Sequence, residues 1–414
     1  MTKHLETTLI AGLDIGTSKT VALIGELLED GQISVIGVGE QVSRGMDKGG
    51  VNDLDSVVQS ITRALHQAEA MAECEVNSVM LSISGKHISC QNEQGMDTID
   101  EEEVTQDNVD NVIYMARSVK MPNERKVLHV LPQEFIIDNL QDGIRNPIGM
   151  SGMRLEAKVH MITCASDMAK NITKCAQRAG LSVDDSDIVF SGLASAEAVL
   201  TEDEKALGVC LIDIGGGTTD IVVYTNGVIR HIAVVPIAGN QATTDIAKIF
   251  RTPLANAEEI KVKYACAKAS LANKTQGIEV PSVGGRDARS MSVQTLAEVV
   301  EPRYTEFFEL VLEELKASGF DEQIAAGIVL TGGTVKIDGV IEVAESCFGM
   351  PVRVANPNTL KGYNNLIEGP QYATAQGLLH MAAKQLLDHN SEKTKSKSFK
   401  NIFSQLQSWV KKNL

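Results

Sequence analysis

The 414-residue sequence has no hydrophobic run of transmembrane length, and its first residues, Met1–Thr8, lack the apolar core of a signal peptide. Its seven cysteines are scattered, odd in number and form no C-x-x-C pair, which argues against a disulfide framework and a zinc site. Basic residues are outnumbered 38 to 54, and the net charge of −16 argues against nucleic acid as a partner. We therefore expect a cytoplasmic protein with reduced thiols.

The most informative stretch that is present is Asp213–Asp220, which has the sequence DIGGGTTD. It lies between the apolar Leu207–Ile212 and the β-branched Ile221–Tyr224, so a glycine-rich turn joins two strands. Consecutive glycines let the backbone approach a ligand closely, and successive N–H groups can form an anion site. An ordinary tight hairpin is the alternative, although such a turn needs neither three glycines nor two acids. The stretch favours phosphate binding, with Asp213 as a candidate for holding a hydrated divalent cation.

A second stretch, Asp14–Thr20, repeats this arrangement near the start of the chain. It has an Asp-Ile-Gly followed by hydroxyl residues, and it joins predicted strands at Leu9–Ile15 and Thr20–Leu28. A third strand follows in both copies, at Ile33–Val42 and at Val228–Ile237, and then a helix. This internal duplication predicts two similar α/β lobes, each presenting a phosphate loop to the cleft between them. The length of the chain also favours more than one subdomain.

Each lobe is interrupted by a segment that the other lobe lacks. The first contains a predicted helix start at Asp100–Gln106, and the second has a helical pattern over Ala257–Ala269 followed by the loop-rich Lys274–Arg289. A third glycine pair, Gly332 and Gly333 with Thr334, follows a buried strand, and strand ends are where α/β proteins bind ligands. The expected division is a first lobe of 1–84 with 161–196 and 357–387, an insert of 85–160, a second lobe of 197–238 with 304–356, an insert of 239–303, a flexible linker of 388–398 and a helix of 399–414.

The tail differs from the rest of the chain in charge and pattern. Residues 391–414 contain six lysines and one glutamate, and 399–414 place large apolar side chains on one helical face. An amphipathic helix on a polar tether, with the only tryptophan of the chain, is typical of an interfacial membrane anchor. A helix docked on the protein body is the alternative. The residues expected to enter the membrane are Phe399, Ile402, Phe403, Leu406, Trp409 and Val410.

The duplicated Asp-x-Gly loops, the third glycine loop and the helix between the lobes resemble the actin, Hsp70 and sugar-kinase superfamily of ATP-binding proteins. Within it, the chain closely resembles the FtsA family of bacterial cell-division proteins, which tie FtsZ filaments to the inner membrane. The resemblance extends over nearly the whole length and includes SRGM at 43–46, SGKHI at 84–88, PQEF at 132–135, Asp213–Asp220 and the tail. It implies an α/β, duplicated actin-like (ribonuclease H-like) two-lobe fold. It also implies that the first insert is distinctive of FtsA and that the second binds FtsZ.

The resemblance implies a site for ATP and Mg²⁺ as well. Asp14 and Asp213 would orient waters around the Mg²⁺, a cation that prefers oxygen ligands and keeps much of its hydration. The Glu-x-x-Lys pair would approach the ribose, although a solvated ion pair is equally expected from sequence. Arg286 and Arg289 would pair with the acidic FtsZ tail, although solvated loop arginines are common. The residues expected to bind the nucleotide are Gly16, Thr17, Ser18, Lys19, Gly215, Gly216, Gly217, Thr218, Thr219, Glu258, Lys261, Gly332, Gly333 and Thr334.

One departure from the superfamily bears on activity. Hsp70-like relatives have a glutamate between the lobes that positions the attacking water, whereas this chain has Gly192 near that place and Glu197 farther on. We therefore expect slow ATP hydrolysis at most, in a non-enzymatic scaffold that self-associates and binds FtsZ and other division proteins at the cytoplasmic face of the inner membrane. A small-molecule kinase is the alternative, but it has no evident use for the tail. A chaperone-like ATPase would need a β domain for which the C-terminal part is too short.

Overall fold

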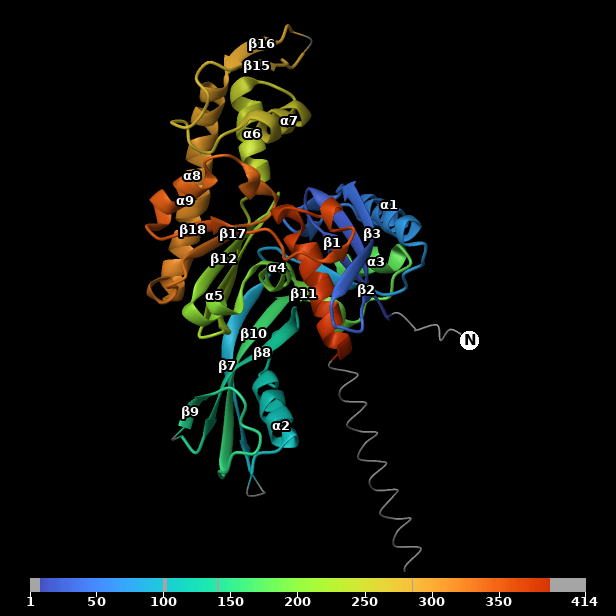
Figure 1. Cartoon of the computed structure of the whole chain (residues 1–414), viewed down its shortest axis with the longest axis vertical. Coiled ribbons are helices and arrows are strands. Elements are labelled where there is room, and N and C mark those ends of the chain that lie inside the picture. The colour runs from blue at the N-terminus through green and yellow to red at the C-terminus, as the bar shows by residue number, and fades with distance from the viewer. Residues whose placement is uncertain (1–7, 100–102, 140, 285, 388–414) are drawn as a thin grey trace, which may run out of the picture.

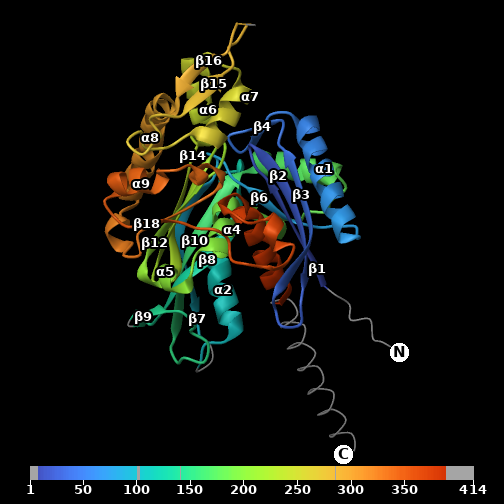
Figure 2. The ribbon, with the colours of Figure 1, turned by 45° about the horizontal axis from the view of Figure 1, so that its top comes forward.

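The computed structural model describes residues 8–99, 103–139, 141–284 and 286–387. Two lobes lie side by side, with one insert at each end of the second lobe (Figures 1 and 2). Within the described ranges no helix combines the length and the apolarity needed to cross a membrane. The predicted linker and tail, 388–414, lie outside the described residues.

The first lobe is built on a six-stranded sheet in the order β11-β6-β1-β2-β3-β19. Strands β1 to β3 are antiparallel neighbours, while β6 runs parallel to β1. Its strands are β1 (Thr8–Ile15), β2 (Lys19–Leu27), β3 (Ile33–Val42), β6 (Met80–Ile83), β11 (Ile188–Phe190) and β19 (Lys361–Gly362), beside the short pair β4 (Met46–Asp47) and β5 (Gly50–Val51).

Helices cover both faces of this sheet because glycines in the strands let them approach. A Cβ at Gly39 of β3 would lie 1.8 Å from the Ala64 carbonyl oxygen of helix α1 (Leu54–Ala72). A Cβ at Gly12 of β1 would lie 2.9 Å from Leu378 in the helix 373–387, on the opposite face. Asp53 caps the N-terminus of α1, and α3 (Ser166–Arg178) packs beside this helix.

The second lobe repeats the same plan in a five-stranded sheet, β14-β13-β12-β17-β18. Again three antiparallel strands are followed by a parallel strand beside the first, so the predicted duplication is confirmed in the topology. The strands are β12 (Val209–Ile214), β13 (Thr219–Thr225), β14 (Val228–Val235), β17 (Ile328–Thr331) and β18 (Val352–Val354). The remaining helices of the two lobes are α4 (Ser191–Val199), α5 (Glu202–Leu207), α8 (Val293–Ser318) and α9 (Val340–Phe348), with short 3₁₀ turns η1 (Asp185–Asp187), η2 (Asp321–Gln323), η3 (Gly333–Lys336), η4 (Asn364–Leu366) and η5 (Pro370–Tyr372).

Two helices join the lobes along their shared edge. Helix α4 packs on β12 and β13, and it crosses the helix 373–387 where a Cβ at Gly377 would lie 1.7 Å from the Ala194 carbonyl oxygen. The crossing therefore requires glycine at 377. Both helices are rich in small residues, which fits the close packing predicted for 372–387.

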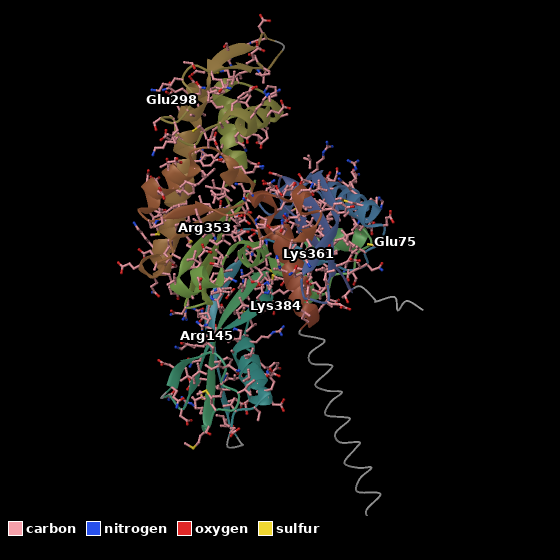
Figure 3. The ribbon with its side chains drawn as sticks, viewed as in Figure 1. Glu75, Arg145, Glu298, Arg353, Lys361 and Lys384 are labelled. Atoms are coloured by element: carbon pink, nitrogen blue, oxygen red, sulfur yellow. The ribbon has the colours of Figure 1, made fainter. Side chains whose placement is uncertain are left out.

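The first insert is a four-stranded sheet, β7-β10-β8-β9, with one helix on it and a small core of its own. It leans on β14 of the second lobe, where Gln133 Nε2 donates to the Ile229 carbonyl at 2.6 Å and Cys90 Sγ lies 3.4 Å from the Ile232 carbonyl. Arg145 is at the same junction (Figure 3) and donates to the Asn226 carbonyl. The elements are β7 (Ser89–Thr98), α2 (Gln106–Arg117), β8 (Arg125–Ile137), β9 (Gln141–Ile144) and β10 (Arg154–Ala165).

Three predicted elements differ from the structure. The helix expected to start in Asp100–Gln106 begins only at Gln106, because Thr105 forms its capping box. The helix expected over Ala257–Ala269 is α7 (Leu254–Tyr264), which begins after Pro253 and ends before an extended Ala265. The predicted loop Lys274–Arg289 contains a hairpin of β15 (Gly277–Val280) with β16 (Arg289–Ser292), whose strands are too short and polar to give a clear pattern. Helix α7 and the β15–β16 hairpin belong to the second insert, together with α6 (Gly239–Phe250).

Candidate functional site

The two glycine-rich turns close in the same way and face each other across the lobes. In the first, the Gly16 N–H donates to the Lys19 carbonyl at 3.0 Å, and in the second the Gly215 N–H donates to the Thr218 carbonyl at 3.0 Å. The turns also contact each other, since a Cβ at Gly216 would lie 1.9 Å from Ser18 Oγ. This contact places the two predicted phosphate loops at one site.

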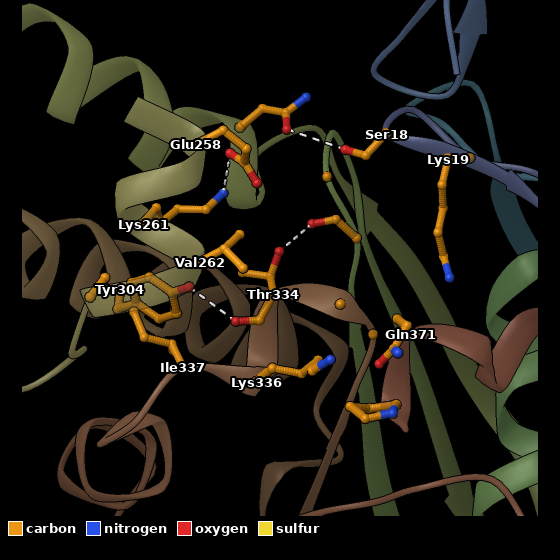
Figure 4. Close-up of a pocket in the computed structure, with 18 of the residues that line it drawn as sticks. Ser18, Lys19, Glu258, Lys261, Val262, Tyr304, Thr334, Lys336, Ile337 and Gln371 are labelled. Carbon is orange, nitrogen blue, oxygen red and sulfur yellow. Dashed lines mark hydrogen bonds and ion pairs between the residues drawn. The ribbon is translucent and has the colours of Figure 1, made fainter. Parts of the chain in front are cut away.

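A cavity of about 1090 Å³ opens at this meeting point (Figure 4). It extends from the two turns to η3 and α7, between the second lobe and its insert. Thr219 does not line it, because its hydroxyl donates to the Ile237 carbonyl at 2.8 Å. The predicted nucleotide and metal residues that line it are Asp14, Gly16, Thr17, Ser18, Lys19, Asp213, Gly215, Gly216, Gly217, Thr218, Glu258, Lys261, Gly332, Gly333 and Thr334.

Three aspartates are gathered at the base of the cavity. Asp14 accepts from Ser82 Oγ at 2.7 Å, Asp213 accepts from Ser195 and Thr374, and Asp220 accepts from Ser84. Asp213 and Asp220 are cross-strand partners in the β12–β13 hairpin. All three side chains have hydroxyl partners, and no lysine or arginine within the described part of the chain forms a salt bridge with them.

Burial raises the pKa of each of these carboxyl groups. The pKa of Asp213 is raised to about 6 by burial, with the charge of Asp14 adding to the effect. Burial raises the pKa of Asp14, and for Asp220 burial and the neighbouring Asp213 raise the pKa well above its usual value. Among the described residues, no three His, Cys, Asp or Glu side chains are close enough to chelate a metal directly.

The third glycine loop is locked onto the second turn. Thr334 Oγ1 donates to the Gly215 carbonyl at 2.6 Å, and the buried Tyr304 hydroxyl donates to the Thr334 carbonyl at 3.0 Å (Figure 4). Gly332 has a φ of +92°, and a Cβ there would lie 2.3 Å from Asp213 Oδ1. The glycine pair thus fixes the cavity wall directly beside the aspartates.

The predicted Glu-x-x-Lys pair lies on α7 at the far side of the cavity. Lys261 Nζ is 2.8 Å from Glu258 Oε2 and donates to the Gly239 carbonyl at 3.1 Å and to Thr243 Oγ1 at 2.8 Å (Figure 4). Thr243 also donates to Glu258. The pair is thus part of a hydrogen-bond network that joins α7 to α6, rather than a freely solvated ion pair.

Comparisons with known proteins agree with this geometry. A model of the cell division protein FtsA matches residues 210–377, and a model of the SHS2 domain inserted in FtsA matches 85–163. The chain is 52% identical to the cell division protein FtsA of Escherichia coli K12, with complete coverage of both chains, and 50% identical to that of Pseudomonas aeruginosa, with 98% of each covered. The chain belongs to the FtsA family. The resemblance noted from the sequence is confirmed.

The actin-like fold is confirmed by solved structures that share little sequence. The PilM–PilN type IV pilus biogenesis complex gives a TM-score of 0.63 at 16% identity, covering 90% of this chain and 98% of that one. MreB5 of Spiroplasma citri bound to ADP gives 0.53 at 16% identity, covering 96% and 99%. This FtsA family member is therefore a cell-division protein on an actin-like scaffold.

In this FtsA family member, the segment between the lobes has no acid where Hsp70-like relatives place their glutamate. Gly192 lies at the second residue of α4, where a Cβ would contact the Phe190 ring and Val222. Glu197 does not line the cavity, and its carboxylate lies 3.5 Å from Lys205 Nζ. Glu197 therefore contributes no carboxylate to the cavity.

The predicted partner residues belong to the β15–β16 hairpin, at one end of the molecule (Figures 1 and 2), and neither lines the cavity. Arg286 is exposed, and Arg289 at the start of β16 donates to the Phe250 carbonyl at the end of α6. The predicted membrane residues at 399–410 lie outside the described residues. Several residues at the cavity were not predicted: Asp220, Ser84, Tyr304, Lys336 and Tyr372. Only Asp220 had a sequence signal, as the second acid of DIGGGTTD.

Proposed function

We propose that this protein is an ATP-binding scaffold of bacterial cell division. It binds ATP with Mg²⁺ in the cleft, self-associates, holds the C-terminal tail of FtsZ on its second insert, and attaches to the cytoplasmic face of the inner membrane at the division site. The observation that carries the nucleotide part is the pair of matched glycine turns, each flanked by a buried aspartate, that meet at one cavity.

The residues at the cavity suit ATP and Mg²⁺. Asp213 and Asp220 are buried, Asp14 is half-buried, and none of them forms a salt bridge with a lysine or arginine among the described residues, so a hydrated divalent cation would relieve the repulsion between them. When bound, Mg²⁺ would neutralise phosphate charge. The N–H groups of the two turns, with the hydroxyls of Ser18 and Thr218, supply donors for phosphate oxygens. The ADP bound to the actin-like MreB5 supports a nucleotide at this cleft.

We propose that ATP acts mainly as a structural ligand. Fast hydrolysis depends on a residue that positions the attacking water, and Gly192 and Glu197 do not provide one. ATP would instead favour one arrangement of the lobes and so one state of self-association. Steady-state turnover on lipid with excess Mg-ATP tests this, and turnover like that of a metabolic kinase would contradict it. Transfer of phosphate to a small acceptor would favour the kinase alternative.

The proposed FtsZ contact is on the second insert. Arg286 and Arg289 are both exposed, and although Arg289 donates to the Phe250 carbonyl, the remaining N–H groups of the two side chains can meet an acidic peptide. The protein as a whole is strongly acidic, and over 277–292 Glu279 and Asp287 balance the two arginines, so the arginines would recognise such a peptide by paired hydrogen bonds rather than by a net positive charge. Reversing both charges should abolish pelleting with FtsZ and leave lipid binding intact.

The proposed membrane attachment is through 399–414. The body is acidic and repelled by anionic lipid, whereas 391–414 carries six lysines against one glutamate. Full burial of one large apolar side chain is worth about 1.5–3 kcal/mol, compared with about 1 kcal/mol for a lysine near the surface. Apolar insertion should therefore contribute more to membrane binding than the lysines do. Self-association should strengthen this binding, because several tails in one assembly bind the same membrane together.

One experiment separates these parts. The full chain and a chain ending at Ser398 are pelleted with liposomes of mixed anionic composition, with and without FtsZ and Mg-ATP. We expect the full chain to bring FtsZ to the liposomes and the shortened chain to bind FtsZ while staying in solution. A full chain with Trp409→Glu keeps the length of the tail but places a charge among its apolar residues. It therefore separates the loss of apolar insertion from the loss of the whole tail. Lipid binding by the shortened chain would contradict the anchoring role.

A further inference from the structure

The ammonium group of Lys19 lies at the edge of the cavity between two residues that are distant in sequence. Its Nζ is 3.5 Å from Glu40 Oε2 and 3.7 Å from the centre of the Tyr372 ring. The Tyr372 hydroxyl donates to the same Glu40 oxygen at 2.7 Å. We call these three residues the Lys19 clamp. They join the start of β2, the end of β3 and the last residue before the helix 373–387.

Lys19 is held in the clamp without a hydrogen bond. Among the described residues its Nζ is buried and has no acceptor within hydrogen-bond distance, although an ammonium group carries three donors. Burial lowers its pKa, so the charged form is incompletely stabilised where it lies. Lys19, Glu40 and Tyr372 all line the cavity, and Lys19 extends from the first glycine turn toward its interior (Figure 4). An anion in the cavity would thus supply the hydrogen-bond acceptor that Lys19 Nζ lacks in the clamp.

We propose that nucleotide phosphates and the Glu40–Tyr372 pair compete for Lys19, so that phosphate binding loosens the start of the helix 373–387. This inference rests on the proposed binding of ATP in the cleft. Phosphate oxygens form short, charge-assisted hydrogen bonds, whereas Glu40 lies beyond hydrogen-bond distance and Tyr372 offers only its ring face. The phosphates should therefore take Lys19 from the clamp.

The position of Tyr372 gives this competition a consequence at a distance. Tyr372 ends η5 and directly precedes the helix 373–387, which is followed by the proposed linker and membrane helix. When Lys19 leaves, Tyr372 loses the cation over its ring and keeps its bond to Glu40 and its packing against the core of the first lobe. Because coupling between two binding events is reciprocal, weakening the clamp must also strengthen phosphate binding. Glu40 and Tyr372 are thus positioning residues for Lys19.

The test uses the full chain and measures two quantities. Mg-ATP affinity is measured by calorimetry, and backbone hydrogen exchange is measured in peptides covering 370–380 with and without saturating Mg-ATP. The variants are Tyr372→Leu, which removes the ring, Tyr372→Phe, which keeps the ring and removes the hydroxyl, and Glu40→Gln. Tyr363→Leu and Glu29→Gln are the controls, because both residues are exposed and lie outside the cavity lining.

In the wild type we expect Mg-ATP to speed exchange in 370–380. Tyr372→Leu should exchange quickly with or without ATP, and both it and Glu40→Gln should bind Mg-ATP about two- to fivefold more tightly, the scale of one exposed ion pair. Tyr372→Phe should keep part of the ATP response, and both controls should keep all of it. Weaker ATP binding in Tyr372→Leu and Glu40→Gln, or ATP binding without a change in exchange, would overturn the clamp alone. A wild-type chain that binds no Mg-ATP would overturn the proposed function as well.

Discussion

Replacing Asp213 with asparagine should stabilise the nucleotide-free protein. Burial raises the pKa of Asp213 from 3.8 to about 6, so keeping it ionised at pH 7 costs the folded state about 3 kcal/mol. Asparagine removes the charge and can still accept from Ser195, but its amide adds a buried donor that costs about 1–2 kcal/mol if unpaired. The expected net gain is about 1–2 kcal/mol, or about 1–3 °C in Tm for a chain of this length.

The pH dependence of this gain has a definite sign. The folded-state pKa is raised, so the wild-type protein loses stability as pH rises from about 4 to about 6, and the loss is complete above that range. The difference in Tm between Asp213→Asn and the wild type should therefore be full at pH 7.5 and nearly absent at pH 4.5. Asp142→Asn is the matched control, because Asp142 is exposed on β9 of the first insert.

Magnesium and ATP should reverse the order of the two proteins. At about 100 times its Kd a ligand stabilises the folded state by about 2.7 kcal/mol, and Asp213→Asn should lose most of that gain if Asp213 helps to hold Mg²⁺. Thermal unfolding in EDTA and in Mg-ATP measures both effects. A variant that is less stable than the wild type in EDTA at pH 7.5, or one that is stabilised by Mg-ATP as much as the wild type, would refute the reasoning.

Two further substitutions test the close packing at glycines. Gly377→Ala must push α4 and the helix 373–387 apart, and this overpacking should cost about 3 kcal/mol. Alanine also has a higher helix propensity than glycine, which should return about 1 kcal/mol. We therefore expect the free energy of unfolding to fall by about 2 kcal/mol. Gly277→Ala, whose new Cβ would meet nothing nearer than 3.6 Å, should lose less than half of that in the same denaturation assay, and equal losses would contradict the packing argument. Gly332→Ala should displace Asp213 and weaken Mg-ATP binding by about tenfold or more in calorimetry. Gly349→Ala has the same left-handed backbone but open space, so unchanged ATP binding is expected there, and a loss equal to that of Gly332→Ala would refute the clash.

Local patterns were sufficient to predict most of the fold. The strands on either side of the two glycine turns, the cap at Asp53 and the helix after Gly239 all depend on residues close together in the sequence. The duplication then extended these local features to a two-lobe plan. Where the pattern was weak the prediction failed, as in the short polar strands β15 and β16, whose register depends on pairing between residues about ten positions apart.

The site was predictable only where a motif marked it. The glycine turns carried their own signal, but Ser82, Ser195 and Thr374 are ordinary residues on separate elements, and only folding brings their hydroxyls to the aspartates. Tyr372 likewise reaches Lys19 across more than 350 positions of sequence. No pattern within a single sequence records such contacts, so the supporting layer of the site had to come from the structure.

The structure also changes which residues give the strongest support for a nucleotide. The three glycines at 215–217 were interpreted as room for phosphate, but Gly216 and Gly217 also lie where the second turn touches Ser18 and Thr17 of the first. Contact between the lobes could by itself require two of them. The aspartates have no such explanation, because burial raises the pKa of all three carboxyl groups, the neighbouring aspartates add to the effect at Asp213 and Asp220, and keeping these groups ionised weakens the fold. A bound cation would remove that cost, so Asp14, Asp213 and Asp220 support a Mg-nucleotide site more strongly than the glycines do.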